Sequence, residues 1–291
     1  MLTVRSGCKI NLFLNVLHRR DDGFHELESV MQPIGLYDQL TIEAQDRPAI
    51  DLTCAHPEVP LGPENLVCKA AKRFLEANGI EGGVKIHLEK KLPVAAGVGG
   101  GSGNAAATLT GLNALNDGVM GDAALWALAA ELGSDVPFFL SPGPGIATGR
   151  GERVESLPAF SMFEDSCVIL VNPGFGVPTP WAYKHLSFDE GGVHSPITLG
   201  NFLSALNASQ WSEVMSGLFN SLEQPVFRKY PILQLIRSGL LEAGADGALL
   251  SGSGATVFGI VRDGEQGEAV RHRFLEIYEG DCWSQVVPLG A

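Results

Sequence analysis

The amino-acid sequence predicts an α+β fold, because its apparent strands and helices are grouped rather than strictly alternating. Apolar or alternating segments typical of strands dominate the first third, around residues 3–5, 9–16, 40–44 and 50–54. Helical patterns fill most of residues 199–243, and the chain ends with two short strands, a helix and a further strand. At 291 residues the chain is long enough for two domains. We expect these to be residues 1–155 and 156–291.

Composition and charge favour a small-molecule partner. The chain has 33 acidic and 20 basic residues, giving a net charge of -13, which disfavours binding to nucleic acids and anionic membranes. An apolar share of 45% with 18% charged residues indicates a compact globular protein. An anionic ligand would therefore need a local positive site.

The cysteines and histidines show no disulfide or metal-binding pattern. Five cysteines are scattered without a CxxC pair, as in proteins of the reducing cytoplasm, and the seven histidines include no HExxH sequence. The apolar stretch 10–17 resembles the core of a signal peptide, but Asn11 and Asn15 interrupt it and no cleavage site follows. We therefore expect a cytoplasmic protein without an export signal or membrane span.

A glycine-rich loop lies between a predicted strand over residues 84–88 and a predicted helix after residue 104. Five glycines, at positions 97, 99, 100, 101 and 103, fall within seven residues. Because glycine has no Cβ, the backbone can approach a ligand closely and point several amide groups at it. The N-terminus of the following helix would add a positive dipole end. The loop therefore predicts a phosphate-binding site.

Other interpretations of this loop are weaker. A flexible linker is seldom flanked by an alternating strand and an uninterrupted helix. No Gly-Lys-Ser or Gly-Lys-Thr follows, so the loop is not a Walker A loop. The dinucleotide-binding fingerprint is met only as Gly101-x-Gly103-x-x-Ala106, without a supporting βαβ unit. The sequence thus indicates a phosphate loop of another kind.

Three further stretches carry polar or glycine residues whose meaning is open when each is taken alone. Lys9 and Asn11 share one face of a predicted strand, and such a pair without context is usually a solvated edge. Asp135 follows a predicted helix that Asp122 caps and Gly133 ends, and taken alone it is better explained as a simple turn residue. Residues 251–254 form a second glycine turn, which by itself is compatible with a hairpin connection.

Taken together and in this order, these stretches resemble the motifs of the GHMP kinase superfamily. The resemblance spans nearly the whole chain and rests on residues 9–12, 22–27, 63–66, 92–106, 133–137, 149–153, 179–180 and 251–255. The segment Asp-Gly-Phe-His-Glu-Leu at 22–27 is its most specific part, because the related mevalonate and homoserine kinases lack it. The chain is similar to those members of the superfamily that act on a cytidine diphosphate-linked erythritol of the non-mevalonate isoprenoid pathway.

The resemblance implies a two-domain fold, with an N-terminal domain similar to ribosomal protein S5 domain 2 and a ferredoxin-like α+β C-terminal domain. It implies transfer of the ATP γ-phosphoryl group to the C2 hydroxyl of 4-diphosphocytidyl-2-C-methyl-D-erythritol. ATP would be the co-substrate, and Mg²⁺ would bridge its β- and γ-phosphate oxygens. The expected partners are these small molecules, and either a monomer or a homodimer is compatible with the sequence.

The resemblance also implies which residues perform the reaction and bind ATP. Asp135 would accept or orient the hydroxyl proton, and Lys9 would lie beside it, keep it ionised and offset charge on the transferring group. Ser102 is a candidate ligand of the magnesium ion. The residues implied in ATP binding are Asn65, Lys90, Pro93, Val94, Ala95, Ala96, Gly97, Val98, Gly99, Gly100, Gly101, Ser102 and Gly103.

A second group of residues is implied in binding the cytidine substrate. Its base would lie between Phe24 and Tyr183, with Trp181 as a competitor for stacking, and His25 would read the base edge. Asn11 would hydrogen-bond the hydroxyls of the acceptor. The implied substrate-binding residues are Asn11, Phe24, His25, Thr179 and Tyr183.

The chain departs from the family at a few positions, and two alternative functions stay open. The family usually has glycines at Ala95 and Ala96, serine at Gly103, tyrosine at Phe24 and alanine at Cys8. One alternative is a GHMP kinase for a mevalonate- or homoserine-type alcohol, which the segment at 22–27 opposes. The other is a nucleotide-binding regulator without turnover, which the presence of both proposed catalytic side chains opposes.

Overall fold

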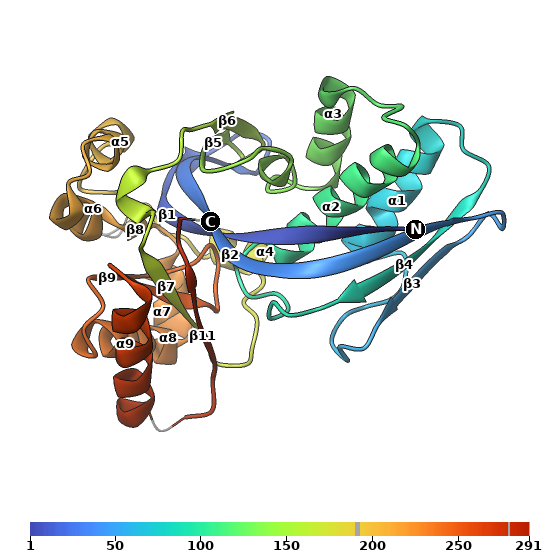
Figure 1. Cartoon of the computed structure of the whole chain (residues 1–291). Helices are drawn as coiled ribbons and strands as arrows, with labels where there is room; N and C mark the ends of the chain where they lie inside the picture. Colours follow the sequence, from blue (N-terminus) through green and yellow to red (C-terminus); the bar gives the residue numbers. More distant parts are fainter. Residues whose placement is uncertain (190–192, 279, 291) are drawn as a thin grey trace. The chain divides into compact units, whose positions relative to one another are not determined.

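The structure is a computed structural model that describes residues 1–189, 193–278 and 280–290 (Figure 1). Helices and strands occur together with two separate sheets, which confirms the predicted α+β class. The strands are β1 (Leu2–Arg19), β2 (His25–Gln45), β3 (Ile50–Cys54), β4 (Gly83–Glu89), β5 (Gly145–Gly149), β6 (Arg153–Ser156), β7 (Cys167–Asn172), β8 (Phe219–Asn220), β9 (Gly247–Leu250), β10 (Val257–Val261) and β11 (Trp283–Pro288). The helices are α1 (Leu66–Ala77), α2 (Gly100–Leu115), α3 (Asp122–Leu132), α4 (Thr179–Lys184), α5 (Leu199–Asn207), α6 (Trp211–Gly217), α7 (Glu223–Lys229), α8 (Pro231–Glu242) and α9 (Gly264–Ile277), with short 3-10 helices η1 (Pro137–Leu140) and η2 (Ser161–Phe163).

The chain forms two compact units, and each is assembled from separated segments. The first unit contains Met1–Cys8, Leu36–Val94 and Gly99–Pro142, and the second contains Lys9–Gly35, Ala95–Val98 and Gly143–Ala291. The long strands β1 and β2 contribute residues to both units. The expected division into domains 1–155 and 156–291 stays a prediction.

The two N-terminal strands are longer than the sequence pattern suggested. Residues 3–5 and 9–16 belong to the single strand β1, and residues 40–44 are the end of β2. The physical reason is visible in β1, where every residue from 8 to 16 is buried. A strand that is buried on both faces shows no alternation by which its length could be recognised.

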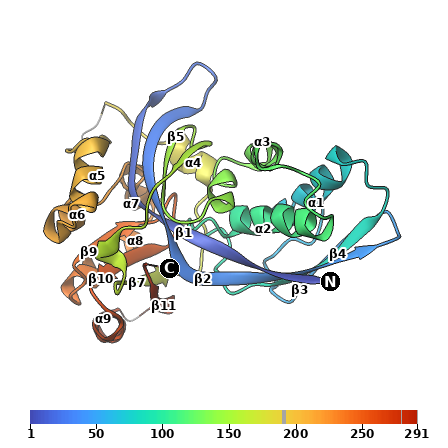
Figure 2. The same cartoon turned by 45° about the horizontal axis from the view of Figure 1, so that its top comes forward.

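In the first unit, three helices pack against one another beside one sheet. Its strands follow the order β3-β4-β2-β1, with β4 antiparallel to β2 and parallel to β3. Helix α1 packs along α2, and both contact α3; Figure 2 shows α1 and α2 side by side on the sheet. The core between them is made of apolar side chains such as Leu40, Ile42, Phe74, Ile86 and Leu109.

The helix boundaries of this unit follow mostly from local signals. Helix α1 begins after Asn65, whose side chain accepts a hydrogen bond from the Val67 amide. Helix α3 ends before Gly133, also as predicted. The prediction that Asp122 caps α3 was wrong, because the N-cap residue is Gly121 and Asp122 is the first helical residue. A carboxylate there still interacts favourably with the helix dipole.

The second unit contains an antiparallel sheet in the order β11-β7-β10-β9. Strands β9 and β10 are buried along their whole length, and α8 and α9 pack against each other and against this sheet. In the same unit the end of β1 pairs in parallel with β8, and the start of β2 pairs with β5. Among the described residues, no helix combines the length and apolar character needed to cross a bilayer.

Helix α2 approaches β1 so closely that position 103 has no room for a side chain. A Cβ added to Gly103 would lie 2.3 Å from the Gly7 carbonyl oxygen and 3.0 Å from the Ser6 hydroxyl oxygen. A serine at this position could therefore be accommodated only if the strand or the helix moved.

We expect Gly103→Ser to lower the free energy of unfolding by about 1–3 kcal/mol, the usual cost of overpacking, measured by urea denaturation. Gly101→Ala in the same helix is the control. Its added methyl would be 3.6 Å from the nearest atom, Leu66 Cδ1, and alanine has the higher helix propensity, so stability should be unchanged or higher. Equal stability of Gly103→Ser and the wild type would contradict the close approach.

Candidate active site

The predicted phosphate loop leads into the first turn of α2. Gly99 is the N-cap residue, and its φ of 73° is in the left-handed region that glycine adopts readily. Its carbonyl oxygen accepts the hydrogen bond from the Gly103 amide at 2.8 Å. The amides of residues 100–102 precede that bond, so the helix itself offers them no partner. They are suitable donors for an anion.

The segment of the loop around Gly97 packs against the C-terminal glycine turn. A Cβ on Gly97 would lie 2.1 Å from the Ser251 carbonyl oxygen and 2.8 Å from the Gly254 amide nitrogen. The Ser251 hydroxyl donates a hydrogen bond to the Gly97 carbonyl at 3.0 Å. The glycine is therefore required by close approach of two backbones, and the turn at 251–254 is more than a hairpin connection.

Two backbone hydrogen bonds hold the rest of this segment. The Thr256 amide donates to the Ala96 carbonyl at 3.0 Å, and the Lys9 amide donates to the Val98 carbonyl at 2.9 Å. Residues 95–98 consequently contact both the N-terminal and the C-terminal motif. The fold thus brings together parts of three motifs that are far apart in the sequence.

Ala95 begins this segment with an unusual backbone conformation. Its φ of 53° lies in the left-handed region, where an alanine is less stable than a glycine by about 1–2 kcal/mol. The position is one at which the superfamily usually has glycine. A Cβ on Gly176 would lie only 2.9 Å from the Ala95 methyl carbon, so the neighbouring chain also passes close to it.

Two polar residues that the sequence did not single out support the C-terminal turn. The Asn220 side-chain amide donates to the carbonyls of Leu250 and Gly252, each at 2.8 Å. The Glu223 carboxylate accepts a hydrogen bond from the Leu250 amide at 3.0 Å. Both residues act on a segment about thirty positions later, so no local pattern points to them.

Lys9 and Asn11 lie on β1 and are buried, which rules out the solvated edge as their explanation. The Lys9 ammonium donates to Asn11 Oδ1 at 2.6 Å, and Asn11 Nδ2 donates to the Ser29 hydroxyl at 2.8 Å. The Ser29 hydroxyl in turn donates to the Phe13 carbonyl at 2.7 Å. A buried ammonium next to an amide is thereby fixed on one strand face.

Asp135 belongs to the turn that joins α3 to η1. The Val136 amide donates to the Gly133 carbonyl at 3.1 Å and closes this turn, and the Val136 side chain is buried. The 3-10 helix that follows packs against α2. Asp135 and the start of α2 thus belong to the same unit, whereas Lys9 belongs to the other; the pairing of Asp135 with Lys9 stays a prediction.

Asn65 and Lys90 both make contacts within the first unit. The Asn65 side chain accepts from the Val67 amide at 2.8 Å and donates to the Pro60 carbonyl at 2.6 Å. The Lys90 ammonium forms an ion pair with Asp38, and the two side chains are 6% and 0% exposed. Their part in binding ATP stays a prediction.

Aromatic residues predicted to bind the nucleobase form two groups. The His25 and Tyr183 rings are 5.3 Å apart, and Phe188 lies 6.1 Å from His25. Phe24 is 53% exposed, and the Arg150 guanidinium lies 4.7 Å from its ring centre. Burial and the nearby positive charge of Arg19 lower the pKa of His25, so its imidazole is neutral at pH 7.

Trp181 has other partners, which weakens its candidacy for base stacking. Its ring stacks on His185 at 4.4 Å, and the Lys229 ammonium lies 4.1 Å from the ring centre. Thr179, at the start of the same helix, shares a hydrogen bond of 2.9 Å with the Ser253 hydroxyl. Thr179 is therefore tied to the C-terminal glycine turn.

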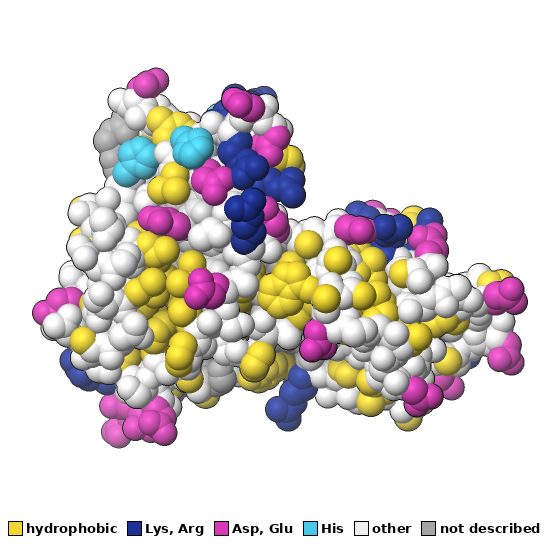
Figure 3. All heavy atoms as spheres, turned by 90° about the horizontal axis from the view of Figure 1, so that it is seen from above, with side chains coloured by type: hydrophobic (Ala, Val, Ile, Leu, Met, Phe, Trp, Pro, Cys, Tyr) yellow, Lys and Arg dark blue, Asp and Glu magenta, His cyan; other side chains and the backbone are white. Residues whose placement is uncertain are grey.

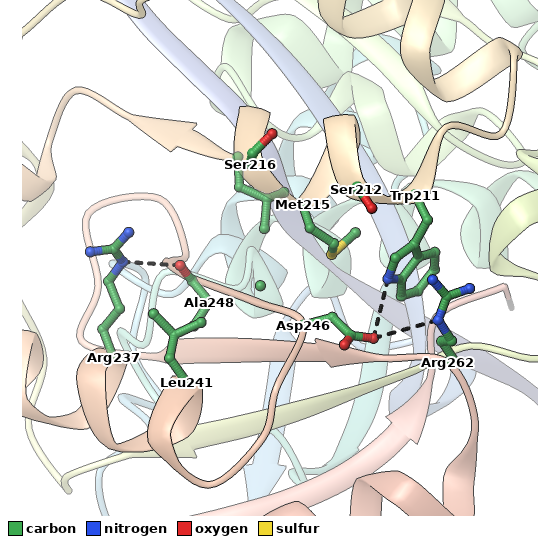
Figure 4. A pocket seen from close by; sticks show the side chains of 11 residues that line it. Trp211, Ser212, Met215, Ser216, Arg237, Leu241, Asp246, Ala248 and Arg262 are labelled. Atoms are coloured by element: carbon green, nitrogen blue, oxygen red, sulfur yellow. Dashed lines mark hydrogen bonds and ion pairs between the residues drawn. The ribbon is translucent and has the colours of Figure 1, made fainter.

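A cavity of about 430 Å³ lies elsewhere in the second unit (Figure 4). Its polar groups bond to one another, since Asp246 accepts from the Trp211 indole at 3.1 Å and lies 3.9 Å from Arg262, while Arg237 donates to the Ala248 carbonyl. No predicted site residue lies among the described residues that line it. It is not the candidate active site.

Side chains of both charges lie together on the surface. On the face displayed in Figure 3, Lys and Arg side chains have Asp and Glu beside them, and Arg20 pairs with both Asp22 and Glu26. The five cysteines, all of them within the described residues, form no disulfide. Within the part of the chain that the structure describes, no three His, Cys, Asp or Glu side chains are grouped as a metal site.

Comparison with known proteins supports this picture. Residues 65–143 match the GHMP kinases N terminal domain and residues 202–280 match the GHMP kinases C terminal domain. The chain is 38% identical to the 4-diphosphocytidyl-2-C-methyl-D-erythritol kinase of Pelobacter propionicus, over 98% of both chains. It is 41% identical to that of a Synechococcus species, over 99% of this chain and 94% of the relative. A crystal structure of 4-(cytidine 5'-diphospho)-2C-methyl-D-erythritol kinase superposes with a TM-score of 0.79 at 34% identity, covering 99% of both chains.

The support of the C-terminal turn by Glu223 predicts a pH dependence of stability. Burial raises the pKa of Glu223, although Arg237 and the Leu250 amide act in the opposite direction. A raised pKa means that the folded state binds the proton more tightly than the unfolded state. Stability is therefore lost as the pH rises from about 4.3 through the raised pKa.

We expect Glu223→Gln to remove the contribution of Glu223 titration to the pH dependence of stability. The oxygen of the new side-chain amide can still accept the hydrogen bond from the Leu250 backbone amide. The unfolding free energy of the variant relative to the wild type should rise between about pH 4 and pH 8, measured by chemical denaturation. Glu213→Gln, an exposed position on α6, is the control and should give a much flatter difference. The same slope for Glu223→Gln and the wild type would contradict this account.

Proposed function

The chain belongs to the family of 4-diphosphocytidyl-2-C-methyl-D-erythritol kinases among the GHMP kinases, and we propose that it transfers the γ-phosphoryl group of ATP to the C2 hydroxyl of that erythritol derivative. The observation that carries this proposal is the identity of 38% over 98% of both chains. The reaction belongs to the non-mevalonate route to isoprenoid precursors. The chain is thus a phosphotransferase with an alcohol as acceptor.

The phosphates of ATP are bound by the glycine loop in this proposal. Residues 93–103 wrap the phosphate chain, and the amides at the start of α2 donate hydrogen bonds to its oxygens. Support comes from the left-handed N-cap Gly99 and from the absence of any helical partner for the next three amides. Backbone donors fixed in place stabilise transferring phosphoryl charge without reorganising. Asn65 and Lys90 contact the adenosine part.

Asp135 and Lys9 carry the chemical step. Phosphoryl transfer needs little covalent work from the protein beyond positioning and charge stabilisation. Asp135 accepts or orients the proton of the acceptor hydroxyl, and the Lys9 ammonium offsets negative charge on the transferring group. Asn11 orients the hydroxyls of the acceptor. Support comes from the hydrogen bond between Lys9 and Asn11, which fixes both side chains on β1.

Magnesium enters with ATP in this proposal. Mg²⁺ is usually held by one or two protein groups together with substrate phosphates and water, and the described residues provide no grouped set of three His, Cys, Asp or Glu ligands. The donors present fit this mode of binding, with the Ser102 hydroxyl as a ligand. When bound, the ion neutralises charge on the β- and γ-phosphates.

The cytidine end is recognised by His25 and the aromatic residues around it. Tyr183 stacks on the base, Phe24 covers its other face, and His25 reads the base edge as a neutral imidazole. Support comes from the packing of Tyr183 beside His25 and from the lowered pKa of His25. Thr179 contacts the substrate from the start of α4.

The alternatives are less well supported. A mevalonate- or homoserine-type kinase would not need the segment at 22–27, and the relatives with the same kinase name match almost the whole chain. A regulator without turnover would not need Lys9 and Asp135 together. We place the enzyme in the cytoplasm, because five scattered cysteines without a CxxC pair suit a reducing compartment.

We expect Asp135→Asn to lower kcat by about 10²–10⁴-fold, the usual contribution of an acid–base group, in a coupled assay of ADP release with the cytidyl substrate. The matched control is Asp122→Asn, an exposed position in the first turn of the same unit's α3, which should keep wild-type turnover. Wild-type kcat in Asp135→Asn would remove this residue from the proposed role. No ADP release by the wild type with this substrate would overturn the function.

Tyr183→Ala should raise KM for the cytidyl substrate by about 5- to 150-fold, the equivalent of one base stacking on an aromatic ring, and should leave KM for ATP near its original value. Trp181→Ala is the control, since Trp181 is already stacked on His185, and it should change neither KM strongly. A larger effect on ATP than on the cytidyl substrate would place the base elsewhere.

A further inference from the structure

Asp38 is a buried carboxylate near the end of β2 that the proposed mechanism does not use. Its side chain is fully buried, and no sequence motif includes it. It accepts hydrogen bonds from the amides of Lys91 and Leu92, at 2.8 and 3.0 Å, and forms an ion pair with the Lys90 ammonium. The three residues 90–92 immediately precede the glycine loop, so Asp38 fixes the point at which the loop begins.

The same carboxylate also contacts the other side of the loop. Asn104 Nδ2 donates to Asp38 at 3.0 Å and to the Ser6 hydroxyl at 2.8 Å. Asn104 is buried and follows Gly103, the last residue of the proposed loop. One carboxylate thus connects the residues before position 93 to the residue after position 103.

The Lys90 ammonium of this ion pair lies close to the first turn of α2. A Cβ on Gly100 would be 3.1 Å from the Lys90 ammonium nitrogen, so this cation is next to the first turn of α2. A positive charge close to the positive end of a helix dipole is unfavourable unless it is balanced. Asp38 supplies that balance while it holds both flanks of the loop.

We propose that Asp38 is a positioning residue for ATP, which sets the spacing of the loop and thereby aims the first-turn amides of α2 at the β- and γ-phosphates. The inference rests on the proposed function, because it needs the loop to bind phosphate. Asp38 acts through Asn104 and the loop flanks and does not touch the nucleotide. Its effect should therefore be confined to ligands that carry those phosphates.

Two variants loosen the same connection from opposite ends. In Asp38→Asn, the new amide oxygen still accepts from residues 91 and 92, but its NH2 group faces the donors of Lys90 and Asn104. Asn104→Ala removes the contact to α2 and leaves the ion pair intact. Both variants should bind ATP on the order of 10- to 100-fold more weakly, the range expected from a small misplacement of a binding group.

The measurement is titration calorimetry with ATP and with AMP, which lacks the β- and γ-phosphates, together with near-UV circular dichroism to establish folding. We expect the AMP affinity of Asn104→Ala to stay within about twofold, since this variant leaves Lys90, and with it the proposed adenosine contact, in its ion pair with Asp38. Leu52→Ala, in the core of the same unit, is the control: it should lower the melting temperature without changing the ratio of ATP to AMP affinity.

Each outcome decides the inference. An equal loss of ATP and AMP affinity in Asn104→Ala, or wild-type ATP affinity in either folded variant, would overturn it while the proposed function stands. If Asp38→Asn does not fold, Asn104→Ala decides alone. If the wild type binds no ATP, the proposed function fails, and this inference fails with it.

Discussion

The contact on which the rest of the site depends is the packing of the backbone at Gly97 against the turn at 251–254. The two backbone segments approach so closely that any side chain on Gly97 would overlap the Ser251 carbonyl oxygen. The Ser251 hydroxyl and the Thr256 amide then bond to the carbonyls of residues 97 and 96. A loop rich in glycine would otherwise be free to adopt many conformations, and this contact selects one of them.

Other polar groups form hydrogen bonds with the backbone close to this contact. Asn220 and Glu223 form hydrogen bonds with the backbone of Leu250, next to the turn. The Lys9 amide donates a hydrogen bond to the Val98 carbonyl at the end of the loop segment. Within the first unit, Asp38 performs a comparable task for the flanks of the loop. Buried polar networks of this kind stabilise one conformation when every member is satisfied, which suits a site that must keep donor groups aimed at phosphate.

Local signals in the sequence predicted elements that local interactions determine, such as the helix ended by Gly133. They underestimated β1, because a strand buried on both faces has no alternation. The glycine loop and the Lys9–Asn11 face were recognisable from residue type and spacing. Asn220, Glu223 and Asp38 were not, since each acts on backbone groups that lie 27 to 54 residues away along the chain. Such partners appear only when the chain is folded.

The alanine at position 95, with its left-handed backbone conformation, restricts the freedom of the loop before any ligand binds. A methyl group narrows the range of backbone angles that this residue samples, whereas a glycine would leave them open. For the proposed binding of phosphate, the loop therefore loses less conformational entropy, because part of its ordering is completed when the protein folds. The left-handed conformation of Ala95 thus lowers native stability slightly and favours the proposed binding of ATP.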